Sequence, residues 1–231
     1  MKGCQWMKTL AKGWKLYEAV WLLAFSALAL VLTIIWNDNL FGFSVFITGV
    51  LCVVLAAKGN ITTYLFGMYN TFGYAWLAWN NHLFGEVSLN LLFFVPMNVI
   101  GFMMWKKNMN GYTVEMKGLT GKGMVLTGVT CILSILVLGY GLSLIPEQNN
   151  PYVDATTNVL SVIATILMVL RYKEQWLLYI VLNVFTVVLW WYRLRSGSSD
   201  GAMMIVMWSA YLVNAIYGYV NWNRGAIAEN S

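Results

Sequence analysis

The sequence contains few charged residues. Of its 231 residues, 10% are charged and 60% are hydrophobic. A soluble domain has roughly 25% charged residues, so this chain cannot cover a water-facing surface. The composition therefore predicts an integral membrane protein in contact with a lipid bilayer. We interpret the net charge of +5 as a sign of membrane topology, not of contact with nucleic acid.

Cysteine, histidine and deeply placed charges are also scarce. Cys4, Cys52 and Cys131 form no CxxC pair, and His82 is the single histidine, in a predicted loop. No lysine lies deep in an apolar run, which excludes a retinal Schiff base. No acidic residue or histidine lies near the middle of such a run, so no proton or sodium relay is evident. We therefore expect no metal, no cofactor and no enzyme activity.

Long apolar runs indicate about eight membrane helices and an all-α fold. A helix needs about 20 mainly apolar residues to cross the hydrocarbon. Such runs occupy residues 17–36, 41–57, 62–80, 84–105, 123–145, 154–170, 175–193 and 201–222. The third and fourth runs are separated by a polar and aromatic stretch that blurs their boundary, so seven or nine spans also fit.

Lysine and arginine are distributed unevenly over the predicted loops. If the N-terminus is cytoplasmic, only Arg193 and Arg195 of the 14 basic residues fall on the outer side. Short cytoplasmic loops are the ones that accumulate Lys and Arg. This bias predicts an even number of spans with both termini in the cytoplasm.

The chain resembles itself when it is shifted by 115 to 117 residues. The matched pairs are Lys58 with Lys173, Tyr64 with Tyr179, Trp76 with Trp191, Gly101 with Gly218 and Trp105 with Trp222. A three-helix unit repeated directly would return inverted, and one linker helix restores the parallel sense. We predict two parallel three-helix repeats in a 3-1-3 arrangement, an architecture that transporters use, with one extra helix in front. The predicted parts are the cytoplasmic N-terminus and extra helix at 1–36, the first repeat at 37–110, a cytoplasmic loop and linker helix at 111–148, and the second repeat with a cytoplasmic C-terminus at 149–231.

Amide and aromatic side chains recur at helical spacing within the predicted spans. Gln175, Tyr179 and Asn183 fall at i, i+4 and i+8, on one face of the seventh span. The fourth span repeats this spacing with Asn90, Phe94 and Asn98. The eighth has a similar face, formed by Tyr211, Asn214 and either Tyr217 or Gly218. Any single Asn could instead be a hydrogen-bonding contact between helices. The recurrence favours a binding site for a neutral or singly cationic heterocycle with hydroxyl groups, because aromatic faces attract cations. A phosphate fits poorly, since the interior has no Arg or Lys.

The motif R-x-x-E-Q-W-x-x-Y-x-x-x-N, from Arg171 to Asn183, resembles the PnuC family of bacterial nicotinamide riboside transporters. The runs "LCVVLAAKGNITTYLFG", "FGE", "PMNVIGFMMW" and "GYVNW" support the resemblance in the same order. It implies a fold similar to the SWEET sugar transporters, a bacterial inner membrane location and facilitated diffusion of the unphosphorylated vitamin. It also implies a functional link to a cytoplasmic kinase that traps the vitamin. Gln175 and Tyr179 stand where other members have Asn and Trp.

The leading hypothesis is therefore a uniporter for nicotinamide riboside. The candidate substrate-binding residues are Gln175, Asn183, Tyr179, Trp176, Asn98, Asn214, Phe94, Trp190 and Tyr217. Alternatives are a transporter of thiamine, riboflavin or a deoxynucleoside, an ion-coupled transporter, and a receptor or structural bundle. A membrane enzyme would have only Glu86, His82 and Asp154 for its chemistry. Glycine-rich helix faces permit a homo-oligomer without specifying its size.

Overall fold

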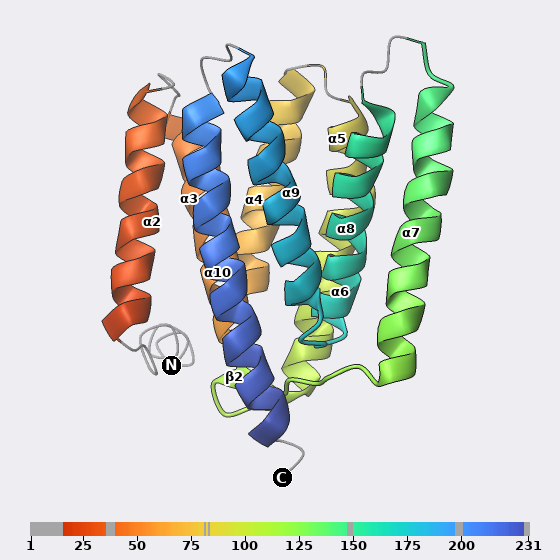
Figure 1. Cartoon of the computed structure of the whole chain (residues 1–231). Helices are drawn as coiled ribbons and strands as arrows, with labels where there is room; N and C mark the ends of the chain where they lie inside the picture. Colours follow the sequence, from red (N-terminus) through yellow and green to blue (C-terminus); the bar gives the residue numbers. More distant parts are fainter. Residues whose placement is uncertain are drawn as a thin grey trace. The chain divides into compact units, whose positions relative to one another are not determined.

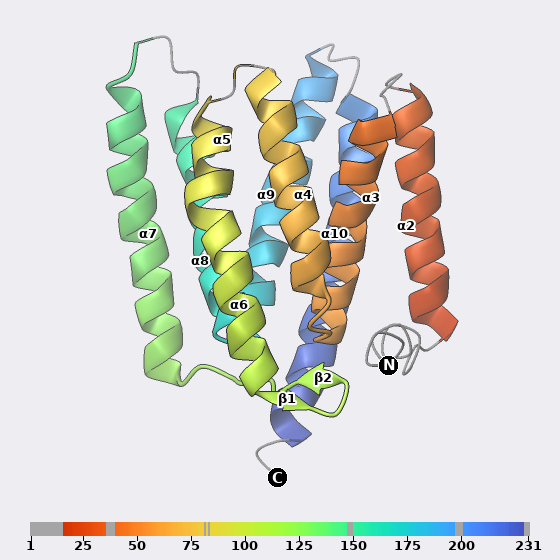
Figure 2. The same cartoon turned by 180° about the vertical axis from the view of Figure 1, so that it is seen from behind.

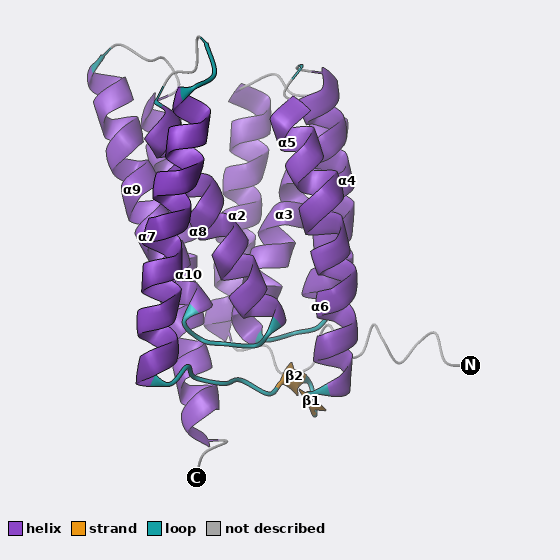
Figure 3. Ribbon diagram, turned by 90° about the vertical axis from the view of Figure 1, so that its right-hand side faces the viewer, coloured by secondary structure: helices purple, strands orange, loops and turns teal. Residues whose placement is uncertain are grey.

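The computed structural model describes residues 16–35, 40–80, 82, 84–146, 150–196 and 201–228, and nearly all of them are helical (Figure 3). The chain divides into two compact units, Met1–Glu115 and Met116–Ser231, and each is considered by itself. The basic residues predicted to hold the N-terminus in the cytoplasm, up to Lys15, lie outside the described residues.

The first unit consists of helices followed by a small hairpin. Its elements are α2 (Leu16–Ile35), α3 (Leu40–Lys58), α4 (Thr63–Asn80), α5 (Phe84–Leu89), the π-helical segment η1 (Asn90–Phe94), α6 (Val95–Lys107), β1 (Met109–Asn110) and β2 (Thr113–Val114). Helix α3 packs against α2 and α4, and α4 packs against α5, η1 and α6 (Figure 2). The last three form one continuous helical rod, which matches the predicted fourth span.

The π-helical segment lies directly before Pro96. The Val95 N–H bonds to the Asn90 carbonyl, five residues back, which is the π pattern. Because proline has no N–H to donate, the ordinary α ladder is already interrupted here, and one wider turn is a common way for a helix to accommodate this. The π geometry was not predicted from the sequence.

The second unit contains α7 (Gly121–Ser143), α8 (Pro151–Val169), α9 (Gln175–Arg195) and α10 (Gly201–Ala228). The Thr120 hydroxyl accepts a hydrogen bond from the Gly123 N–H at 3.2 Å and caps α7. Pro151 begins α8 at the position where its missing N–H costs nothing. Helix α8 contacts α7 and α9, and α9 contacts α10 (Figure 1).

Each of the eight predicted spans coincides with a helix or, for the fourth, with the rod formed by α5, η1 and α6. Within the described chain, five segments are long and apolar enough to cross a membrane: Phe41–Lys58, Gly85–Lys107, Gly121–Ser143, Pro151–Val169 and Gln175–Arg195. Helix α7 exposes a row of Val, Leu and Ile side chains, as a lipid-facing helix does. The prediction of an all-α, multi-pass membrane protein is confirmed.

The hairpin of β1 and β2 was not predicted. It follows α6 (Figure 3), and its buried Val114 donates a backbone hydrogen bond of 2.9 Å to the Gly59 carbonyl. The hairpin thereby ties the end of the first unit to the turn between α3 and α4.

That turn is repeated in the second unit by the turn between α8 and α9. Gly59 has φ +70° and Arg171, 112 positions later, has φ +69°. The Gly59 N–H bonds to Ala56 and the Arg171 N–H bonds to Met168, again 112 positions later. Each carbonyl also accepts a backbone N–H from the segment between α6 and α7: Val114 donates to Gly59 and Lys117 donates to Arg171, both at 2.9 Å.

The predicted alignment of the repeats is wrong at this turn and right further on. Helices α4 and α9 begin at Thr63 and Gln175, so the equivalent of Tyr64 is Trp176, not Tyr179. Helices α5 and α10 begin 117 positions apart, as predicted. The difference arises because α9 is three residues longer than α4, and the loop after it is two residues longer. A single offset could not describe both parts.

Candidate functional site

The first side chain of α9, Gln175, is completely buried. Neither its Nε2 nor its Oε1 has a hydrogen-bond partner among the residues that the structure describes. Buried polar groups are nearly always hydrogen-bonded, and an unsatisfied one costs about 1–3 kcal/mol. A residue that retains this cost is a strong candidate for binding a polar ligand.

The next residue, Trp176, is 3% exposed. Its indole N–H also has no partner within the described part of the chain. Rings surround it: Trp222 of α10 lies edge-on at 6.3 Å between ring centroids, and Tyr179 lies tilted at 5.8 Å. Two adjacent residues, Gln175 and Trp176, thus combine an amide, an indole N–H and a flat aromatic surface.

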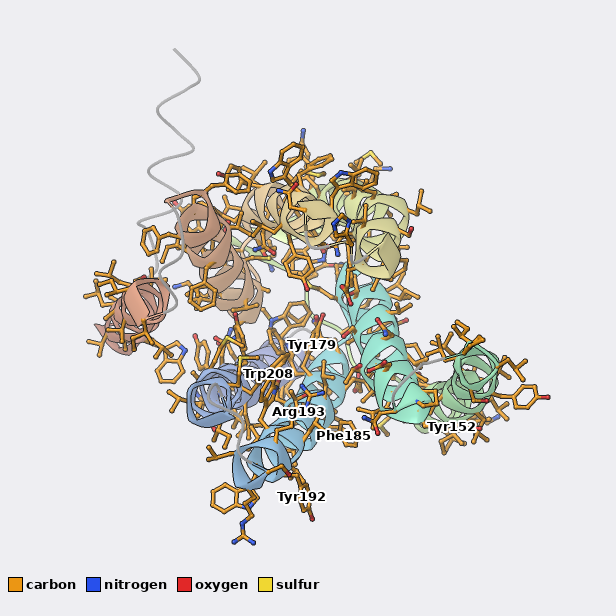
Figure 4. The ribbon with its side chains drawn as sticks, turned by 90° about the horizontal axis from the view of Figure 1, so that it is seen from above. Tyr152, Tyr179, Phe185, Tyr192, Arg193 and Trp208 are labelled. Atoms are coloured by element: carbon orange, nitrogen blue, oxygen red, sulfur yellow. The ribbon has the colours of Figure 1, made fainter. Side chains whose placement is uncertain are left out.

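The face predicted on α9 is a buried face. Tyr179 is partly buried beside Leu178, against the cluster of Cys131, Leu160 and Leu182, and Asn183 is 5% exposed. The Tyr179 hydroxyl lies 3.4 Å from the Thr165 hydroxyl of α8. Tyr192, 66% exposed, leaves the helix on a different side from Tyr179 (Figure 4). Gln175, Tyr179 and Asn183 therefore share one face, as the spacing predicted.

Helix α10 contributes two of the predicted residues. Asn214 is buried, Tyr217 is partly buried, and Asn214 precedes Gly218 by one helical turn. Gly218 faces the Trp176 ring. Asn214 and Tyr217 are therefore close along α10 to the contact between α10 and the start of α9.

Trp190 does not lie with Gln175. It is fifteen residues further along α9, which is about 22 Å at a rise of 1.5 Å per residue. The Arg193 guanidinium lies over its ring at 4.8 Å. One small ligand cannot contact both residues, so only a role along the path remains for Trp190.

The two predicted residues of the first unit already take part in local contacts. The Asn98 amide donates to the Phe94 carbonyl at 2.9 Å and to the Thr71 hydroxyl at 3.2 Å. Its Oδ1 lies 2.6 Å from where a Cβ on Gly67 would be. This amide packs α6 against α4, the structural role that the sequence left open for any single Asn.

The charged residues before α9 hold the segment that leads into α7. The Glu174 carboxylate accepts a hydrogen bond from the Leu119 N–H at 3.0 Å. The Lys173 ammonium donates to the side-chain amide oxygen Oδ1 of Asn223 at 2.6 Å, and the Lys117 ammonium lies 4.7 Å from the centre of the Tyr172 ring. The charges at this end of α9 therefore hold neighbouring segments in position, and the next charged residue along the helix is Arg193.

Sequence reasoning did not assign Trp222 or Thr165 to the site, and it named Gly218 only as an alternative to Tyr217 on one helix face. Gly218 and Trp222 had been matched with Gly101 and Trp105 as repeat positions. A glycine and a tryptophan four residues apart, present twice, were the signal for a close helix contact. Thr165 had no comparable signal, because threonine is common in membrane helices.

Comparisons with known proteins show which family the chain resembles. Residues 39–224 match the family model described as nicotinamide mononucleotide transporter. The chain is 35% identical to the nicotinamide riboside transporter PnuC of Neisseria mucosa, over 95% of this chain and 85% of that one. It is 36% identical to PnuC of Haemophilus influenzae, over 92% of both.

A solved structure, a crystal structure of the vitamin B3 transporter PnuC, is similar over 99% of both chains, with a TM-score of 0.81 and 34% identity. The family model covers most of the sequence and the relatives match nearly all of their own length. The chain therefore belongs to the PnuC family of membrane transporters.

Proposed function

We propose that this protein carries nicotinamide riboside across the bacterial inner membrane by facilitated diffusion, and that phosphorylation by a cytoplasmic kinase traps it. The buried Gln175 amide, which no described residue satisfies, is the observation that carries the proposal. We infer the identity of the substrate from the names of the relatives.

Residues of the second unit are assigned to recognition by their chemistry. Gln175 and Asn183 hydrogen-bond the ribose hydroxyls or the carboxamide, and Asn214 adds a third amide. Trp176 and Tyr179 offer ring faces to the pyridinium, whose positive charge an aromatic face attracts. Tyr217 and Trp190 line the path of the substrate.

The riboside fits this residue set better than the mononucleotide named by the family model. A phosphate group carries roughly −1.5 to −2 charges and is normally paired with Arg or Lys. The assigned residues are amides and aromatic rings. Lys173, the nearest lysine along the chain, donates to the Asn223 side chain, and Lys117 lies over the Tyr172 ring. An unphosphorylated, singly cationic ligand needs no such partner.

The remaining parts of the proposal concern arrangement. The two local repeats favour the 3-1-3 arrangement of parallel three-helix repeats preceded by an extra helix, and the distribution of Lys and Arg favours cytoplasmic termini. Glycines of α7 such as Gly128 and Gly141, which face open space, permit self-association. Light scattering of the purified protein measures the size of any oligomer.

Isothermal titration of the purified protein tests the substrate. Nicotinamide riboside, nicotinamide mononucleotide, thiamine, riboflavin and a deoxynucleoside are titrated under the same conditions. We expect the riboside to bind at least about tenfold more tightly than the others, which corresponds to about 1.4 kcal/mol. Preference for any other compound contradicts the proposed substrate.

Uptake into kinase-free proteoliposomes tests the mechanism. We expect labelled nicotinamide riboside to equilibrate and not to accumulate, with or without an imposed proton or sodium gradient. Accumulation driven by either gradient contradicts facilitated diffusion and favours ion coupling.

A further inference from the structure

Gly218 lies directly against the ring of Trp176. A Cβ added to Gly218 would lie 2.6 Å from Cδ2 of that ring and 2.7 Å from Cε2 and Cε3. Real Cβ atoms do not approach other atoms this closely, so only glycine lets α10 come this near to the indole.

Trp222 holds the same indole from a second position on α10. It is one turn beyond Gly218, fully buried, and edge-on to Trp176 at 65°. The indole N–H of Trp176 has no hydrogen-bond partner in the described chain, so that group does not orient the ring. Packing against Gly218 and Trp222 therefore sets where the Trp176 ring lies.

The first unit has the same packing of a glycine and a tryptophan against an aromatic ring, but a different residue precedes that ring. A Cβ on Gly101 would lie 2.3 Å from the Tyr64 ring, and Trp105 is edge-on to that ring at 5.0 Å and 84°. The residue before Tyr64 is Thr63, whose hydroxyl donates to the Cys52 carbonyl at 2.8 Å. The residue before Trp176 is Gln175, whose amide has no partner among the described residues.

We propose that Gly218 is a positioning residue for substrate binding, which fixes the Trp176 ring beside the open Gln175 amide. This rests on the proposed function of that site. The ring face and the amide come from adjacent residues at the start of α9, so a ligand that stacks on one and hydrogen-bonds to the other requires a fixed ring. An alanine at 218 forces the ring back by about 0.8 Å to regain ordinary contact at 3.4 Å.

Titration of Gly218→Ala with nicotinamide riboside tests the proposal, with Gly101→Ala as the matched control. Displacements of this size are costly in binding sites, so we expect the dissociation constant to rise at least about tenfold in Gly218→Ala. In Gly101→Ala the same clash occurs next to Thr63, whose hydroxyl already has a partner. We expect the dissociation constant of that variant to change by less than about twofold. Thermal unfolding of both variants establishes that they fold and lose comparable stability.

A double-mutant cycle separates positioning from a general loss of structure. In a Trp176→Ala background, which removes the whole ring that Gly218 contacts, we expect Gly218→Ala to change the dissociation constant by less than about twofold. Trp222→Phe provides a second route to the same ring if Gly218→Ala does not fold, and we expect it to raise the dissociation constant at least about threefold.

Three results overturn the proposal. The first is an unchanged dissociation constant in folded Gly218→Ala or, where that variant does not fold, in Trp222→Phe. The second is an equal rise in Gly101→Ala, and the third is independent effects of Gly218→Ala and Trp176→Ala. The wild-type titration reports separately on the proposed function. If another compound of the panel is the one that binds, the ratio between variant and wild type is measured with that compound.

Discussion

Replacing Gln175 with methionine separates a binding amide from a structural one, because the two roles predict opposite effects on stability. Methionine has a similar volume and adapts to irregular packing, so the substitution removes the amide without opening a large cavity. The Gln175 amide has no protein partner in the described chain. Removing it relieves a buried polar group, which we expect to stabilise the ligand-free protein by about 1 kcal/mol.

The measurement is thermal unfolding of purified protein followed by tryptophan fluorescence, together with titration of nicotinamide riboside. For a chain of this length, 1 kcal/mol corresponds to a rise in melting temperature of about 2–4 °C. We expect the same variant to lose at least about tenfold in affinity, since the substrate loses its partner amide. Gain of stability with loss of binding is the signature of a functional group.

Thr63→Val is the control, because Thr63 occupies the equivalent position in the first unit. Its hydroxyl is fully buried and donates to the Cys52 carbonyl at 2.8 Å. Loss of that bond is expected to cost about 1 kcal/mol and to leave affinity unchanged. If Gln175→Met instead lowers the melting temperature while nicotinamide riboside binds as before, the reasoning about Gln175 is refuted.

Further substitutions extend this comparison. Asn183→Ala should raise the dissociation constant at least about threefold without loss of stability. Asn70→Ala, which removes a bond of 2.7 Å to the Val45 carbonyl, should lower the free energy of unfolding by about 1 kcal/mol and bind the substrate normally. Calorimetry and thermal unfolding check both variants. The reverse pattern contradicts the assignment. Glu174→Ala removes the acceptor of the Leu119 N–H and should lower stability by about 1–3 kcal/mol, whereas Glu174→Gln, which keeps an acceptor, should lose less. Equal losses in the two Glu174 variants would show that this hydrogen bond contributes nothing.

The helices were predictable because the bilayer imposes a length and a composition on each span. The limits of α9 at Gln175–Arg195 lie close to those of the apolar run. The face of Gln175, Tyr179 and Asn183 followed from the period of 3.6 residues alone. The sequence did not predict which amides in the spans have a hydrogen-bond partner, because the partners lie on other helices. Thr71, for example, accepts from Asn98 on a neighbouring helix.

Features that depend on backbone geometry escaped the sequence. The hairpin of β1 and β2 has only two residues in each strand, too few for an alternating pattern. The repeat was predicted at the wrong offset near Tyr64, because matching by residue type pairs Tyr64 with Tyr179. The structure pairs Tyr64 with Trp176 by their place after equivalent turns, at Gly59 and Arg171. Residue identity is a poor guide when two copies have diverged in function.

Few side chains are shared by the two units around these turns: between residues 59–66 and 171–178, only Leu65 and Leu177 match. The turn before Thr63 and the turn before Gln175 share their hydrogen bonds and their left-handed residue. By the same offset of 112 positions, Cys52 corresponds to the fully buried Ala164.

In the first unit, the Thr63 hydroxyl bonds to the Cys52 carbonyl and also contacts the Cys52 sulfur. The equivalent residues of the second unit are Gln175 and Ala164. The Thr63 hydroxyl has a partner, whereas the Gln175 amide has none among the described residues. Because the backbone is already determined by the repeated turn, the second copy tolerates this cost of about 1–3 kcal/mol without losing its fold. We therefore expect the repeated turn to accept a ligand-binding amide at Gln175 without a change of backbone.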